Sequence, residues 1–380
     1  MVIREFTMSN KIVEWWNVEF DQQETDSVAQ SIVERNISQG VITQRFETEF
    51  AKKLDMPYAI ATTSGSVALL MALMTVGIKQ GDEVILPNRS FIATPHAVMM
   101  SGGTVVLVGT LPDIPVMDVS QITKKITPCT KAIMPIHLNG RSVDMEVVNN
   151  IASECGLPVI EDAAQALFSK NLTGYLGTQS DIGCFSFGMA KLLPTGQGGM
   201  LVTKKRELYN KLKLIRNHGV FDTFHPDSAY DNFGFNFKYT DLQASIGVEQ
   251  LKKIPAKIEH LKKVYIRYRE GLNDIKSLRL IPVNIENGEV PIYIEVLCND
   301  SREIIAFLSS HKIQARPFHP DLSQSSHLKS KNTFKHPSIF QKRGIILPGG
   351  PNLSLDNVDL VLKTLHLYED VNCKINTKHA

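Results

Sequence analysis

The chain has 380 residues, of which 43% are hydrophobic and 21% charged, a composition typical of a globular protein with a substantial core. Its 41 basic and 39 acidic side chains leave a net charge of +2, which argues against nucleic acid as a partner. The five cysteines are scattered, which argues against a disulfide framework and a cysteine metal site. The longest apolar run, residues 67–78, is too short to span a membrane. We therefore expect a cytoplasmic protein.

Over the first 250 or so residues, apolar runs of strand length alternate with helical patterns. Examples of the helical patterns are residues 67–76 and 145–154. The strand-like runs are residues 58–62, 83–86, 104–108, 131–135, 158–161, 182–186 and 199–202. Apolar strands that alternate with helices predict a mostly parallel sheet covered on both faces. We therefore predict a large α/β domain over residues 1–250.

The pattern changes after Thr240. A charged helical stretch covers residues 241–272, and we expect Pro255 to interrupt it. Helices are predicted near residues 302–310 and 355–368, the second with Ser354 as its N-cap. The intervening strands are predicted at residues 278–283, 291–297 and 313–317. This predicts a smaller α+β domain over residues 251–380, on which part of residues 1–30 could pack.

Asp162 is the first candidate site residue. It follows the short apolar strand 157–161, and ligands of parallel α/β sheets bind beyond the carboxyl ends of strands. A carboxylate in this position is also common as a helix cap or loop residue, so Asp162 alone does not identify a site.

Lys191 is the second candidate. It follows the strand 182–187 and precedes the glycine-rich turn 196–199. Its neighbours Met189, Ala190 and Leu192 are apolar, and desolvation lowers the pKa of a lysine and makes its amine nucleophilic. The ordinary alternative is a solvated surface lysine.

The third candidate is the turn of Ser64, Gly65 and Ser66, between the strand 58–61 and the apolar helix that begins at Val67. Free amides at a helix N-terminus suit a phosphate group. Simple N-capping by Ser64 or Ser66 explains the same residues.

Taken together, these motifs resemble the DegT/DnrJ/StrS family of pyridoxal-phosphate (PLP) sugar aminotransferases. The resemblance extends from about Gly40 to the final helix. The matching stretches are residues 63–69, 81–87, 91–94, 135–140, 161–165, 186–199, 216–219 and 234–238. It implies the PLP fold type I, with a mostly parallel seven-stranded sheet in the large domain and a smaller C-terminal α+β domain.

The resemblance also implies a role for each site residue. Lys191 would hold the cofactor as a Schiff base and move protons, and Asp162 would pair with the pyridine nitrogen. Gln165 would contact the side of the ring that carries the hydroxyl, and Phe91 would stack on the ring. Ser64, Gly65, Ser66 and Ser186 would hold the phosphate. Asn236 would reach the cofactor of a neighbouring subunit, which implies a homodimer with shared sites.

Three departures from the family pattern concern the substrate. Gly188 stands where many relatives carry a histidine, the loop at Thr43 is several residues short, and Arg89 lies in a segment that often reads Ser-Phe-Thr. Arg89 could meet an anionic substrate group or form an ordinary ion pair. His319 is expected near the substrate mouth.

The two other histidines near these motifs do not suggest a metal. His137 is expected to be structural and His218 to be a loop or interface residue, and neither belongs to a metal-ligand cluster.

The resemblance implies transfer of an amino group from L-glutamate to a keto sugar, most often a nucleotide-linked 4-keto-6-deoxyhexose, in amino-sugar and polysaccharide biosynthesis. One alternative is a non-nucleotide ketone, such as a cyclitol or a small keto-phosphate. Another is a non-catalytic PLP-binding regulator. A related dehydratase would carry histidine in place of Lys191, and no G-x-G-x-x-G follows the first strand, as a nucleotide-binding oxidoreductase would require.

Overall fold

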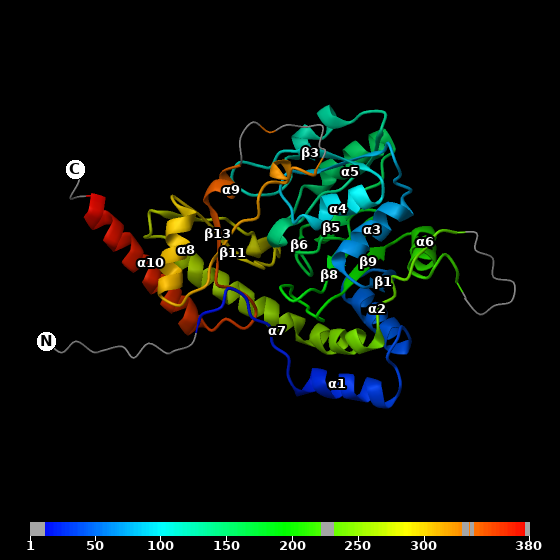
Figure 1. Cartoon of the computed structure of the whole chain (residues 1–380), viewed down its shortest axis with the longest axis horizontal. Coiled ribbons are helices and arrows are strands. Elements are labelled where there is room, and N and C mark those ends of the chain that lie inside the picture. The colour runs from blue at the N-terminus through cyan, green and yellow to red at the C-terminus, as the bar shows by residue number, and fades with distance from the viewer. Residues whose placement is uncertain (1–11, 222–231, 329–333, 335–337, 377–380) are drawn as a thin grey trace.

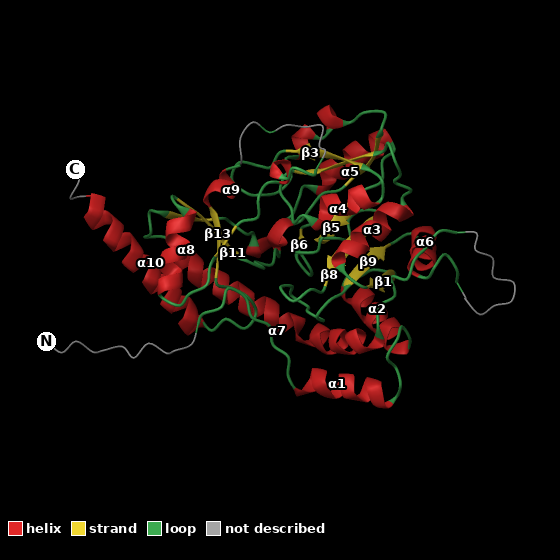
Figure 2. Ribbon diagram, viewed as in Figure 1, coloured by secondary structure: helices red, strands yellow, loops and turns green. Residues whose placement is uncertain are grey.

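The computed structural model describes residues 12–221, 232–328, 334 and 338–376. Its larger part contains two β-sheets surrounded by helices (Figures 1 and 2). A four-stranded sheet has the order β1 (Tyr58–Thr62), β9 (Gly199–Thr203), β8 (Ile182–Ser186) and β5 (Ile160–Asp162). A three-stranded sheet has the order β3 (Thr104–Val108), β2 (Glu83–Pro87) and β4 (Thr130–Ile133).

The two sheets meet between β4 and β5. Isolated parallel bridges join Ile133 to Val159 and Ile136 to Asp162 at this junction. Pairing is parallel for β2 with β3 and β4 and for β5 with β8, but β9 runs antiparallel to both β8 and β1. The α/β arrangement is confirmed, whereas one continuous sheet of seven strands stays a prediction.

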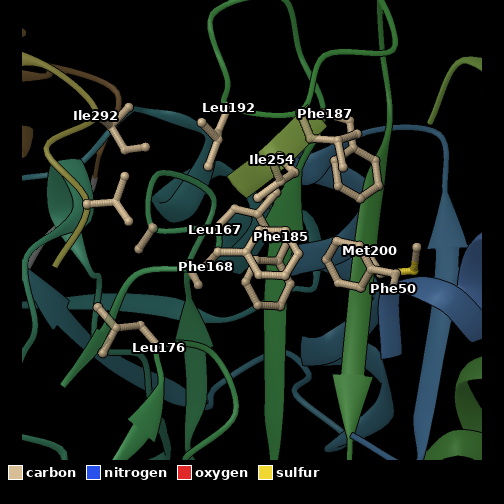
Figure 3. Close-up of a cluster of buried hydrophobic side chains, with 14 of the residues drawn as sticks. Phe50, Leu167, Phe168, Leu176, Phe185, Phe187, Leu192, Met200, Ile254 and Ile292 are labelled. Carbon is tan, nitrogen blue, oxygen red and sulfur yellow. The ribbon is translucent and has the colours of Figure 1, made fainter. Parts of the chain in front are cut away.

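Helices cover this part because their apolar residues face the strands. The sequence of α3 (Gly65–Thr75) is almost wholly apolar, and the helix is largely buried against the sheet. On another side, aromatic side chains such as Phe50, Phe185 and Phe187 form a core that also includes Leu192, the residue after Lys191 (Figure 3). The other helices of this part are α1 (Gln22–Val33), α2 (Val41–Lys53), α4 (Ala93–Met100), α5 (Met145–Cys155) and α6 (Arg206–Arg216), and a small hairpin pairs β6 (Lys170–Asn171) with β7 (Gly174–Tyr175).

The smaller part contains an antiparallel sheet with its own core. The sheet order is β10 (Leu278–Leu280), β11 (Ile294–Cys298), β13 (Gly344–Leu347) and β12 (Arg316–Pro317), with α8 (Ser301–Ser310), α9 (Ile339–Arg343) and α10 (Leu355–Asn376) beside it. Ser354 accepts a hydrogen bond from the amide of Asn357, as a helix N-cap would. A segment near the N-terminus also pairs with the smaller part, because Val13 forms a parallel bridge with Ile313.

Helix α7 (Asp241–Gly271) runs along both parts (Figure 1). The predicted interruption at Pro255 is wrong, because α7 is one continuous helix. A proline removes one intrahelical hydrogen bond, but buried side chains on both sides of it, among them Leu251, Ile254 and Leu261, hold the helix in place. The predicted domain division at residues 250 and 251 falls inside α7 and stays a prediction. None of the described helices is both long and apolar enough to cross a membrane.

Candidate active site

Asp162 lies at the carboxyl end of β5, as expected for a ligand-binding residue. Its carboxylate is buried and accepts two hydrogen bonds, from Thr94 Oγ1 at 2.7 Å and from the amide of Ala164 at 3.1 Å. Burial raises the pKa of Asp162, and the hydrogen bond from Thr94 and the charge of Lys191 only partly oppose this effect. The side chain is therefore a desolvated carboxylate that would gain from a further hydrogen-bond donor or cation.

Lys191 lies in the loop that follows β8, with its amide bonded to the carbonyl of Gly188 at 3.0 Å. The preceding strand and the buried Leu192 and Leu193 hold this loop against the core. Desolvation lowers the pKa of Lys191 to about 8, and the negative charge of Asp162 opposes this shift. A substantial fraction of free amine near neutral pH is what Schiff-base formation requires.

The start of α3 lies directly against the end of β8. Gly65 is so close to Ser186 that an added Cβ would lie 2.6 Å from the Cβ of Ser186. An added Cβ at Gly199 would lie 2.4 Å from the backbone carbonyl oxygen of Ser64. Only glycine therefore fits at these two positions. Ser64 caps α3 by accepting from the amide of Val67 at 3.1 Å, which bears out the capping interpretation. Ser66 is exposed in the first helical turn.

This arrangement fits a phosphate. The first-turn amides of α3 and the hydroxyl of Ser186 lie at one sheet edge, where the helix dipole favours an anion. The same edge carries Asp162 and Lys191, at the ends of neighbouring strands β5 and β8. The residues present can thus supply an anion cradle, a buried carboxylate and an amine of lowered pKa, which are the groups that PLP needs.

A cavity opens beside these residues, between the two parts of the molecule. Phe91, Gln165 and Ser90 line it from the large part, and Tyr293, Arg316 and His319 line it from the small part. Lys191 and Asp162 do not line this cavity themselves, but the hydroxyl of Ser90 is hydrogen-bonded to Thr94 at 2.8 Å, and Thr94 in turn donates to Asp162. Phe91 is 48% exposed and makes an edge contact with His319, at 5.3 Å between ring centroids.

Arg89 lines the same cavity but its charge is already paired. Its Nη1 donates to Asp321 at 2.8 Å and to the carbonyl of His319 at 2.9 Å, and both members of the ion pair are buried. The structure thus favours the ion-pair interpretation of Arg89, although its Nε has no hydrogen-bond partner among the residues that the structure describes. Burial lowers the pKa of His319, and the positive charges of Arg89, Lys191 and Arg316 add to this effect.

Four other residues named from the sequence lie apart from the cavity lining. The hydroxyl of Thr43 donates to Asp241 at 2.6 Å, at the start of α7, so it holds two helices together. Gly188 has open space around it, since an added Cβ would meet only Ser186 Oγ, at 3.8 Å. Asn236 is exposed, and its side chain accepts from the amide of Lys238 at 3.4 Å. His218 is an exposed turn residue with a φ of 54°.

Two buried networks support the site and were not predicted as such. His137 Nδ1 accepts from the amide of Val143 at 3.2 Å, so Nε2 carries the proton and donates to Glu161 at 2.9 Å. This agrees with a structural role for His137. The second network joins the two parts of the molecule, because Asn139 and Arg141 both donate to Glu295 of β11. Thr94 belongs to the stretch 91–94 that resembles the family, but no periodicity or spacing in the sequence predicts its hydrogen bond with Asp162.

No described residues form a cluster of three or more histidine, cysteine or acidic side chains that could hold a metal ion.

Comparison with known proteins agrees with this geometry. The chain is 33% identical to GDP-perosamine synthase from Escherichia coli O157:H7, over 88% of this chain and 92% of that protein. It is 32% identical to 3-oxo-glucose-6-phosphate:glutamate aminotransferase from Bacillus subtilis (strain 168), over 86% of this chain and 75% of that protein. The crystal structure of DesV from S. venezuelae superimposes with a TM-score of 0.86, at 27% identity, over 91% of this chain and 94% of that one. Residues 18–366 match one family over their whole length, and the chain therefore belongs to the DegT/DnrJ/EryC1/StrS aminotransferase family.

Proposed function

We propose that this PLP-dependent aminotransferase moves an amino group from L-glutamate to a keto sugar, with a nucleotide-linked 4-keto-6-deoxyhexose as the first candidate. The observation that carries the proposal is the shared position of Lys191 and Asp162. Asp162 ends β5 and Lys191 follows the neighbouring strand β8 at one sheet edge. Desolvation raises the pKa of Asp162 and lowers the pKa of Lys191, which favours the neutral form of each.

Each residue has a role that its surroundings support. When bound, PLP supplies an electron sink for the carbanion that forms at the substrate carbon. Asp162 would hold a proton on the pyridine nitrogen, and Thr94 would orient that carboxylate. The Nζ of Lys191 would form the covalent link to the protein and then carry a proton to and from the reacting carbon. Ser186 and the first turn of α3 would bind the phosphate, while Phe91 and Gln165 would contact the ring.

The names of the relatives support the substrate class. GDP-perosamine synthase is named for a nucleotide-linked amino sugar, and the Bacillus relative is named for glutamate and a keto-sugar phosphate. The second name favours a second candidate acceptor, a sugar phosphate without a nucleotide. Arg316 is exposed at the cavity and could meet a phosphate of either acceptor.

The active unit in this proposal is a homodimer with shared sites. Asn236 is exposed in the single chain and is free to reach a neighbouring subunit. Around it, three aromatic side chains are exposed to an extent unusual for phenylalanine: Phe221 at 63%, Phe233 at 78% and Phe235 at 60%. Light scattering of the purified protein would test the dimer, and activity regained on mixing Lys191→Ala with Asn236→Ala would test shared sites.

The first experiment is an absorbance spectrum of the purified protein with PLP, before and after L-glutamate is added. Wild-type protein should show a visible band, which glutamate bleaches, and Lys191→Ala should form no such band. Candidate keto sugars, with and without a nucleotide, are then added to the bleached enzyme, and the true acceptor restores the band. Protein that takes up no PLP would contradict the proposed site. Protein that binds PLP but responds to no amino donor would favour a non-catalytic regulator.

A further inference from the structure

The main chain around Lys191 is held by side chains from three separate segments of the chain. The indole Nε1 of Trp16 donates to the carbonyl of Met189 at 3.2 Å, and the hydroxyl of Tyr293 donates to the carbonyl of Ala190 at 2.7 Å. On the other side of Lys191, the Nζ of Lys257 donates to the carbonyl of Leu192 at 3.2 Å. The buried side chains of Leu192 and Leu193 already anchor this loop to the core. The three hydrogen bonds add a constraint on the orientation of its backbone.

The donor Trp16 is itself held firmly. Its ring is nearly buried, and an added Cβ at Gly350, which has a φ of 101°, would lie 3.1 Å from it. The segment before it is fastened to the small part by backbone bonds, from Val13 to the carbonyl of Lys312 and from Gly349 to the carbonyl of Trp15, both at 2.9 Å. Trp16 therefore connects the small part to the loop of Lys191.

One of these two aromatic side chains, Tyr293, also reaches the cavity. The ring of Tyr293 lies 5.2 Å from that of Trp16 and 5.9 Å from that of Trp15, between centroids. Arg316 stacks over Trp15 at 4.0 Å. Trp15, Tyr293 and Arg316 all line the cavity, whereas Trp16 and Tyr293 bind the loop of Lys191. One packed group of side chains thus contacts both the cavity and the loop that carries the lysine.

We propose that Trp16 and Tyr293 are positioning residues that orient Lys191 through its main chain. The inference rests on the proposed function, because it assigns Lys191 the role of cofactor-binding lysine. The lysine side chain has four rotatable bonds, so its nitrogen reaches a defined point only if the backbone from which it starts is fixed. Two bonds to adjacent carbonyls fix that backbone just before Lys191, and their loss should misplace the amine and slow its reactions by about ten- to a hundredfold.

Two conservative variants test this assignment. Tyr293→Phe removes one hydroxyl and Trp16→Phe removes the indole N–H, and each keeps an aromatic ring in the core. The matched control is Tyr265→Phe, which removes a buried hydroxyl that accepts from the amide of Val283 at 2.9 Å within the small part. All three variants lose one hydrogen bond of a buried side chain, but only the first two lose a bond to the loop of Lys191.

The first measurement uses cofactor-free protein. The rate at which an amine-selective acylating reagent labels Lys191 is followed by mass spectrometry as a function of pH, beside the thermal midpoint of each variant. The second measurement is the rate of PLP capture, followed by the visible band. Tyr293→Phe and Trp16→Phe should change the labelling of Lys191 and slow PLP capture about tenfold or more relative to Tyr265→Phe, at a similar thermal midpoint.

Equal labelling and equal PLP capture in Tyr293→Phe and Tyr265→Phe would overturn the positioning role. So would a decline in PLP capture that follows the loss of thermal stability alone, since the control would then decline as well. Failure of the proposed function looks different: wild-type protein would capture no PLP, or Lys191→Ala would capture it as well as wild type does, while the labelling of Lys191 in cofactor-free protein would still report on its position.

Discussion

The two faces of the sheet differ sharply at the end of β5, where Glu161 and Asp162 are consecutive and point to opposite sides. Glu161 accepts four hydrogen bonds, from the ring of His137, the amides of Gly177 and Gln179 and the hydroxyl of Ser180. From the residues that the structure describes, Asp162 accepts two hydrogen bonds, and burial raises its pKa. Two acidic residues of similar burial therefore differ strongly in the number of hydrogen bonds that they accept.

The difference teaches which carboxylate is structural and which is reactive. A buried carboxylate with all its hydrogen bonds made holds loops together and has nothing left to offer a ligand. A buried carboxylate with few hydrogen bonds is poised for a partner, and here the face that bears it also bears Lys191. If this contrast is correct, changes on the Asp162 face should affect chemistry, and changes on the Glu161 face should affect stability.

The largest effect is expected for Lys191→Ala. The variant loses both the nucleophile and the proton carrier, so transamination should fall by about 10⁴-fold or more. Its cofactor-free thermal midpoint should not fall, because a partly desolvated amine is removed. Single-turnover absorbance with glutamate measures the first effect and calorimetry the second. Transamination within tenfold of wild type would remove Lys191 from the chemistry.

Glu161→Gln should act on stability instead. The amide oxygen of the glutamine can accept from His137 and Gly177, and its NH₂ can donate to the hydroxyl of Ser180, which is free to turn, but the NH₂ also faces the amide N–H of Gln179. That one donor left without an acceptor should lower the free energy of unfolding by about 1–3 kcal/mol. Urea denaturation measures this change. If the folded variant retained wild-type stability and lost activity, the assignment of the two faces would be reversed.

Asp162→Asn tests the other face. An asparagine can accept from Ala164 and can donate to Thr94, so the cofactor-free protein keeps both hydrogen bonds and its stability should stay within about 1 kcal/mol. It cannot supply the negative charge that holds a proton on the pyridine nitrogen, and kcat should fall by about 10²–10³-fold, as on removal of a comparable electrostatic group. Steady-state kinetics, with bound PLP verified by absorbance, decide this prediction. A loss of stability like that of Glu161→Gln would abolish the contrast.

Much of the larger part could be predicted from the sequence because its strands are continuous apolar runs. The strands 58–62, 104–108 and 182–186 are observed with the predicted bounds. The predictions were poorer in the small part, where strand 313–317 is reduced to Arg316–Pro317 and β13 was not anticipated. Its short strands are stabilised by pairing with distant residues, which leaves a weak local signal.

The candidate site shows the same limit. Asp162 and Lys191 could be chosen as candidates because strand ends and apolar neighbours are local features, and the family resemblance then implied their roles. The bonds of Trp16, Tyr293 and Glu295 to this region join residues more than 100 positions apart, and no local pattern encodes them. The prediction of a helix break at Pro255 was wrong for a related reason, because tertiary packing outweighs the low helix propensity of proline there.

Thr94→Val sharpens the contrast on a smaller scale. Valine has nearly the shape of threonine but cannot donate to Asp162, so the carboxylate would keep one hydrogen bond and its pKa would rise further. A hydrogen bond to a charged group contributes about 1.5–3 kcal/mol, and PLP affinity should weaken accordingly. The affinity is measured by titration of the visible band. Binding as tight as in wild type would show that Thr94 does not orient Asp162.

The smallest effect concerns pH and the amine that shares this face. Desolvation lowers the pKa of Lys191 to about 8, so the free-amine fraction of cofactor-free protein should rise about tenfold between pH 7 and pH 9 and then level off. The unfolded chain binds more protons than the folded one between this pKa and the ordinary value of 10.5, so the contribution of Lys191 to stability should increase with pH across that window. Labelling of Lys191 in cofactor-free protein measures the fraction directly. A labelling rate that keeps rising tenfold per pH unit through pH 9 would mean an ordinary solvated lysine, and Asp162 would then lack a desolvated partner on its own face of the sheet.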